Sequence, residues 1–173
     1  MGIQIFQYSE SHLEGIRSIL TEYMTFLANE MIKPPWKYNI EVENGVNFSM
    51  KNLDKFAKPD GRLFLVKVED QIAGTISMRK IREDSGEIKR MFVRPNFRGR
   101  KLGNLMIEEV IEVAKENDFS KLYLDTAQYM SSAVNLYKKY GFEKTESYPE
   151  CIVAKELWDN WIFMKKELYC LSF

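Results

Sequence analysis

The segment from residue 87 to residue 117 constrains the fold more than any other part of the chain. Residues 87–93 have the composition of a strand, which runs into a loop that contains Pro95, Gly99 and Gly103. Residues 103–117 then place apolar side chains at the spacing of an amphipathic helix, with charged side chains on the opposite face. A strand, a glycine-containing loop and a helix in this order indicate an α/β architecture.

The flanking segments extend this unit into one mixed sheet with helices on both faces. A capping-box pattern at residues 11–14 predicts the start of a first helix, and the two prolines of residues 33–36 predict its end. A second helix is expected within residues 41–57, and Gly141 is expected to end a fourth, at 131–140, after the helix at 103–117. Further strands are expected at residues 3–8, 63–68, 72–78, 121–125 and 161–168.

Composition limits the possible functions. The 173 residues suit one compact domain, residues 1–173, and 25 basic side chains balance 25 acidic ones, so no global field favours nucleic acid or an anionic membrane. We find no secretory signal and no apolar stretch of the ~18 residues that span a bilayer. Cys151 and Cys170 fit neither a zinc site nor a disulfide framework. We therefore expect a cytoplasmic protein, monomer or homodimer, with no metal and with no nucleic-acid or membrane partner.

The loop between residues 93 and 104 has the chemistry of a phosphate-binding site. A helix N-terminus presents unpaired N–H groups, glycine lets the backbone approach an anion, and Arg94, Arg98, Arg100 and Lys101 add positive charge. The alternative is a solvated basic turn before a surface helix. Neither a GxxxxGK[ST] loop nor a GxGxxG fingerprint is present, so the site differs from the common nucleotide-binding loops.

This segment resembles motif A of the GNAT N-acetyltransferases, [QR]-x-x-G-x-[GA]. Arg98 matches its first position and Gly103 its last, whereas Lys101 replaces the glycine at the fourth, which requires a backbone conformation open to a residue with Cβ. The strand 122–126 (LYLDT) and the helix 133–142, which matches A-x-x-L-Y-x-x-x-G-F, are also similar to the family. The resemblance covers roughly residues 62–145.

The resemblance implies the fold and the cosubstrate. We expect a mostly antiparallel sheet of about six or seven strands, splayed near Met91 and Val93 and flanked by helices. Residues 1–57 would supply acceptor-side helices, and residues 62–145 the acetyl-CoA-binding core. The expected cofactor-binding residues are Met91, Phe92, Val93, Arg98, Gly99, Arg100, Lys101, Leu102, Gly103, Asn104 and Lys138. For Lys138, a solvated surface lysine is the alternative.

Two catalytic residues follow from the same resemblance. Glu87 lies where the family often has a carboxylate base, and Tyr137 matches the tyrosine that often protonates the departing thiolate. Glu87 could instead be an exposed strand-end charge or a partner of Lys89, and Tyr137 could simply pack in the core. Asp125 ends a strand at the edge where α/β sheets place ligands, or it caps a turn.

The implied activity is transfer of an acetyl group from acetyl-CoA, the acyl donor, to a primary amine of a small molecule or peptide by direct attack on the thioester. Two alternatives stay open: a non-catalytic CoA-binding regulatory module, and a protein N-terminal or lysine acetyltransferase. The acceptor site is expected on the first two helices and their connection, which are aromatic and contain few acids, so a polycationic acceptor is not suggested.

Overall fold

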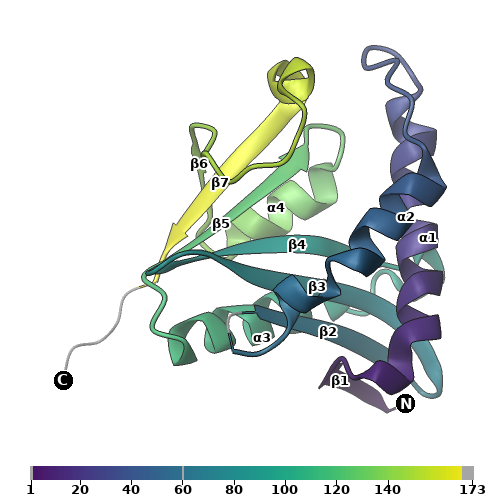
Figure 1. Cartoon of the computed structure of the whole chain (residues 1–173), viewed down its shortest axis with the longest axis vertical. Coiled ribbons are helices and arrows are strands. Elements are labelled where there is room, and N and C mark those ends of the chain that lie inside the picture. The colour runs from purple at the N-terminus through teal and green to yellow at the C-terminus, as the bar shows by residue number, and fades with distance from the viewer. Residues whose placement is uncertain (1, 60, 169–173) are drawn as a thin grey trace.

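The computed structural model describes residues 2–59 and 61–168, and Cys170 lies outside this part of the chain. Its centre is a seven-stranded sheet of order β1-β2-β3-β4-β5-β7-β6, in which only the β4–β5 pair is parallel. The expected mostly antiparallel α/β sheet is therefore confirmed (Figure 1). The strands are β1 (Ile3–Gln7), β2 (Gly61–Val68), β3 (Gln71–Arg82), β4 (Ser85–Val93), β5 (Lys121–Ala127), β6 (Glu143–Thr145) and β7 (Trp161–Glu167).

Helices cover both faces of the sheet. They are α1 (Leu13–Met31), α2 (Val42–Lys51), α3 (Leu102–Glu116) and α4 (Ser131–Lys139). Apolar residues of α1 and of the 3₁₀ turn after α2 pack with Leu63 and Leu65 of β2, and those of α3 pack in a separate core with Val66 and Ile76. Within the described residues, no helix has both the length and the apolar character needed to cross a membrane.

The sheet opens between β4 and β5. Their parallel ladder runs from Ser85 paired with Lys121 to Ile88 paired with Leu124, and beyond these residues the strands diverge (Figure 1). The second half of β4, which contains Met91 and Val93, keeps only β3 as a neighbour. The splay predicted near these two residues is thus present, and it begins at Ile88.

Beside this opening, β4 contains one extra residue that interrupts its pairing with β3. Thr75 pairs with Phe92 and Ser77 pairs with Lys89, so one β3 residue lies opposite Arg90 and Met91 together. This is the pattern of a β-bulge, and Arg90 has a φ of 53°, in the left-handed region. Bulges of this kind re-aim side chains next to active sites.

One local prediction is wrong, and one short strand was not predicted. The first helix begins at Leu13 without a side-chain cap, because Ser9, two residues before the predicted cap, contacts His12 Nδ1 (2.8 Å) and a 3₁₀ turn, Glu10–His12, precedes α1. The sequence analysis also missed β6, which has three residues and pairs along β7. So short a segment shows no alternation of apolar and polar residues that could reveal a strand.

Lys101, which replaces the glycine at the fourth position of the family motif, adopts a left-handed backbone conformation at the start of α3. Its φ of 60° and ψ of 19° lie in the left-handed region, which costs a residue with Cβ roughly 1–2 kcal/mol. Gly99, two residues earlier, has a φ of 80° with open space around it, so its role is conformational. The loop therefore reaches the helix through two residues with positive φ, of which only one is glycine.

This geometry predicts that Lys101→Gly unfolds at a higher denaturant concentration than Lys101→Ala. Both variants remove the same charge, but alanine retains the left-handed strain, so the glycine variant should be more stable by about 1 kcal/mol. Urea unfolding followed by circular dichroism measures the difference. Equal stability of the two variants would contradict the positive φ.

Candidate active site

Two hollows meet where β4 and β5 separate. One is a groove along the loop before α3, and the other is a pocket between α1, α2 and the diverging strands. Met91 of β4 and Met130, just before α4, line both of them. A molecule in the groove can therefore reach the pocket past these two methionines.

The groove contains most of the residues expected to bind a cofactor. It is lined by Met91, Phe92, Val93, Arg98, Gly99, Lys101, Leu102 and Gly103, and on its other side by Tyr129, Met130, Ser131 and Ser132. The α3 N-terminus opens here, so unpaired N–H groups and two basic side chains meet in one place. An anionic group such as a pyrophosphate fits this combination.

Close packing explains why position 103 is a glycine. A Cβ there would lie 2.9 Å from Leu136 Cδ2 and 3.3 Å from Met91 Cε, and both of these side chains line the groove. Gly103 therefore lets α3 approach α4 and β4 closely. The first position of the motif, Arg98, donates from Nε to the Val93 carbonyl oxygen (3.2 Å), which holds the loop against the end of β4.

Three of the expected cofactor residues do not line the groove: Arg100, Asn104 and Lys138. The guanidinium of Arg100 instead lies 5.4 Å from the ring centroid of Phe97. Sequence reasoning missed Ser131 and Ser132, two hydroxyls at the start of α4 whose position facing α3 depends on the tertiary fold.

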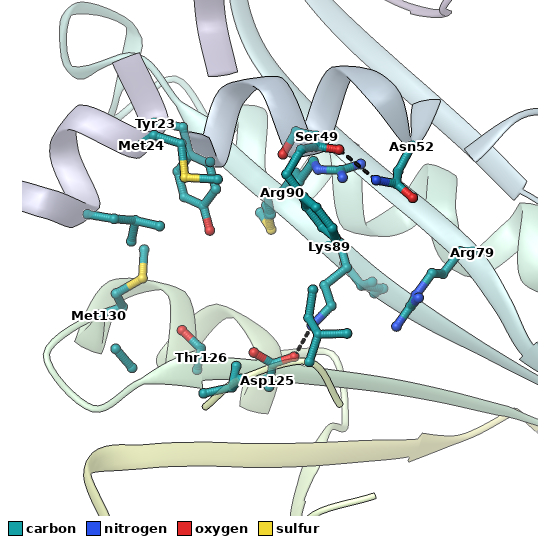
Figure 2. Close-up of a pocket in the computed structure, with 18 of the residues that line it drawn as sticks. Tyr23, Met24, Ser49, Asn52, Arg79, Lys89, Arg90, Asp125, Thr126 and Met130 are labelled. Carbon is teal, nitrogen blue, oxygen red and sulfur yellow. Dashed lines mark hydrogen bonds and ion pairs between the residues drawn. The ribbon is translucent and has the colours of Figure 1, made fainter. Parts of the chain in front are cut away.

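The second hollow is a pocket of about 390 Å³ that both apolar and charged side chains line. Figure 2 shows Tyr23 and Met24 on one side, Asp125 and Thr126 below, and Lys89 and Arg79 on the β-sheet side. Tyr23 belongs to the aromatic stretch expected to form the acceptor site, whereas Phe26 from the same stretch lines the groove. The apolar residues include Met24, Leu27, Ile40, Phe48, Ile152 and Val153, and the charged ones are Lys55, Arg79, Lys89, Arg90 and Asp125.

Tyr137 lines this pocket from α4. Its side chain is 6% exposed and its ring packs against Phe142 with centroids 5.9 Å apart, so it does belong to the core. Its hydroxyl has no hydrogen-bond partner among the described residues. Burial, with the nearby Tyr23 and Asp125, raises the pKa of Tyr137, so the hydroxyl stays protonated near neutral pH.

Glu87 lies deeper than the sequence suggested. It is 0% exposed and lines neither hollow, and two cations contact its carboxylate: Arg79 Nε lies 2.6 Å from Oε2 and Lys89 Nζ 3.0 Å from Oε1. The contact with Lys89 was one alternative that the sequence left open. The hydroxyl of Tyr148, which the sequence analysis did not single out, lies 2.6 Å from Glu87 Oε1.

Asp125 connects this buried cluster to the pocket. Its Oδ2 accepts a hydrogen bond from Lys89 Nζ and lies 3.2 Å from the Tyr148 hydroxyl, while Oδ1 accepts from Trp161 Nε1 (2.8 Å). Burial alone would lower the pKa of Lys89, but the charges of Asp125 and Glu87 outweigh it and the pKa is raised. Lys89 is therefore a cation, and Tyr148 bridges the two carboxylates.

Comparisons with known proteins agree on one family. The model of the acetyltransferase (GNAT) family matches residues 16–142. An uncharacterized N-acetyltransferase of Schizosaccharomyces pombe is 33% identical over 116 residues, which are 61% of this chain and 71% of that protein. The IAA acetyltransferase of Azospirillum brasilense is 34% identical over 92 residues, covering 53% of this chain and 60% of that protein.

Solved structures share the fold. An acetyltransferase of the GNAT family from Staphylococcus aureus has a TM-score of 0.75 and 22% identity, covering 97% of this chain and 100% of that one. The PaiA N-acetyltransferase of Thermoplasma acidophilum, solved in complex with coenzyme A, has a TM-score of 0.73 and 15% identity, covering 96% and 99%. At these identities the likeness extends to the fold.

The buried cluster predicts a large loss of stability in Glu87→Gln. The change leaves Arg79 and Lys89 with one carboxylate fewer, and removing one member of a buried ion pair typically costs about 3–5 kcal/mol. Tyr148→Phe, which removes one hydrogen bond to a charged group, should cost about 1.5–3 kcal/mol. Urea unfolding measures both.

Glu83→Gln is the matched control. Its side chain is 99% exposed in the turn between β3 and β4, so this variant should unfold like the unchanged protein. If Glu87→Gln and Glu83→Gln are equally stable, the buried cluster is not formed as described.

Proposed function

Because this chain belongs to the acetyltransferase (GNAT) family and is thus an N-acetyltransferase, we propose that it transfers an acetyl group from acetyl-CoA to a primary amine of a small molecule or peptide by direct attack on the thioester. The observation that supports this most is the meeting of an anion-binding groove and a pocket at Met91 and Met130, together with Tyr137 in the pocket lining, whose hydroxyl has no hydrogen-bond partner among the described residues.

In this proposal the groove holds the acetyl-CoA. The backbone from Arg98 to Asn104 would bind the pyrophosphate, with the positive end of α3 and the side chains of Arg98 and Lys101 compensating its charge. Met91 to Val93 of β4 would face the pantetheine arm. Residues 62–145 then form the acetyl-CoA-binding core, and α1 and α2, within residues 1–57, form the acceptor side.

The splayed half of β4 would polarise the thioester carbonyl. Beyond Ile88 this strand has lost its β5 partner, so backbone N–H groups that point away from β3 have no ladder acceptor. Such preorganised donors stabilise the charge that develops on a carbonyl oxygen during acyl transfer. Acetyl-CoA supplies this carbonyl and, after the C–N bond forms, the thiolate leaving group.

Two sets of side chains would handle the protons. Tyr137, protonated and facing the pocket, would donate its proton to the thiolate. The amine's proton would pass to Asp125 at the pocket wall. Asp125 could pass it to Tyr148, whose own proton would move to Glu87. Glu87 thus keeps its expected place in proton transfer, but as the inner end of a chain of groups rather than in direct contact with the amine.

The first test of this proposal is thiol release from acetyl-CoA by the purified chain with a panel of primary amines. We expect release that depends on an added amine, with the acetylated amine detected by mass spectrometry. Binding of CoA without amine-dependent release by any member of a broad panel would instead favour a non-catalytic CoA-binding module.

The second test separates the core role of Tyr137 from its proposed acid role. Tyr137→Phe keeps the ring that packs on Phe142 and removes only the hydroxyl, so stability should change little while the single-turnover rate falls about 10²- to 10⁴-fold. The acetyl-CoA dissociation constant serves as control and should stay within a few-fold. A full single-turnover rate in Tyr137→Phe would remove the residue from the chemistry.

A further inference from the structure

One cation in the pocket is shielded from water and has no counter-charge among the described residues. Arg79 and Lys89 are paired with the carboxylates of Glu87 and Asp125, so these four side chains balance. Arg90 lines the same pocket, yet no described residue forms an ion pair or hydrogen bond with it, and its Nη1 atom is buried without a partner. Lys55, the remaining basic residue of the lining, is exposed to water.

The position of Arg90 is costly in two ways. Its backbone has a φ of 53° at the bulge of β4, and its guanidinium lies over Phe56, 4.1 Å from the ring centroid, with the Nη1 atom buried. Burial lowers the pKa of Arg90 to about 10, so the group is still a cation at neutral pH. A buried charge is normally paired, and the ring of Phe56 compensates only part of the lost hydration.

The surroundings of Arg90 favour an anionic group on the acceptor molecule as the partner of its guanidinium. Figure 2 shows Arg90 beside Ser49 of α2, across the pocket from Asp125 and Thr126. A guanidinium binds a carboxylate through two parallel hydrogen bonds, and one surplus cation matches a single negative charge. Met24, Leu27 and Phe48, which line the same pocket, offer an apolar surface.

We propose that the acceptor is an α-amino acid with an apolar side chain, whose carboxylate pairs with Arg90 while its amine faces Asp125. This inference rests on the proposed acetyl transfer and narrows it, because a simple amine or a polyamine would leave Arg90 unpaired. Arg90 is then a specificity residue, and the bulge in β4 is the backbone feature that turns it into the pocket.

The test compares leucine, methionine and phenylalanine with their carboxamides in the thiol-release assay. The carboxamides keep the α-amine and side chain and remove the negative charge. Their amines are less basic and more often unprotonated, so a preference for the acids cannot come from amine reactivity. We expect kcat/KM to favour at least one acid by about 10- to 150-fold, the range for a hydrogen bond to a charged group.

Arg90→Met should abolish this preference by raising KM for the acid far more than KM for the carboxamide, and an unchanged CoA dissociation constant shows that the variant is folded. Arg90→Lys restores the charge without the two-pronged geometry and should recover part of the preference. Equal kcat/KM for every acid and its carboxamide, or an equal rise of KM for both in Arg90→Met, would overturn the inference while leaving acetyl transfer intact.

A binding measurement keeps the two proposals distinguishable if no amine turns over. N-acetylleucine and its carboxamide are titrated calorimetrically into the full chain saturated with CoA, for the unchanged protein and for Arg90→Met. Tighter binding of the acid that disappears in Arg90→Met supports the carboxylate site even if acetyl transfer fails. No difference between the acid and the carboxamide contradicts it.

Discussion

The parallel ladder between β4 and β5 ends at Ile88 and Leu124, and both hollows of the candidate site depend on that ending. A fully paired sheet would fill its own centre with side chains and would leave no path from one face to the other. Here the second half of β4 is held only by β3, so its other edge can serve a ligand. The groove along the loop before α3 and the pocket under α1 and α2 meet at this edge, past Met91 and Met130.

Charge in the pocket is arranged around the same opening. Glu87, Asp125, Arg79 and Lys89 neutralise one another, and Tyr148 bridges the two carboxylates. Burying four charges is tolerable only because each is paired and hydrogen-bonded. Arg90 departs from this rule. Its unpaired guanidinium and its left-handed backbone are both found at the rim of the opening, where strain and unpaired charge are most often linked to ligand binding.

The sequence predicted what depends on local patterns. The strand, loop and helix of residues 87–117, the strands expected at 63–68 and 72–78, and Gly141 with a φ of 80° after α4 all follow from spacing and turn chemistry, and they are confirmed. Most of the groove follows from the motif around Arg98 and Gly103. The burial of Glu87 could not be predicted, because its partner Tyr148 lies 61 residues further along the chain and its position depends on tertiary packing. The same holds for Arg90, whose orientation is set by a bulge that no local signal marks.

The most direct test of the account is a crystal structure of the full chain with acetyl-CoA or CoA. We predict that the pyrophosphate lies at the backbone of residues 98–104, that the pantetheine arm runs along Met91 to Val93, and that the sulfur lies within hydrogen-bond reach of the Tyr137 hydroxyl. A pyrophosphate bound elsewhere, or a sulfur directed away from the pocket that contains Tyr137 and Asp125, would contradict the assignment of the groove to the donor and of the pocket to the acceptor.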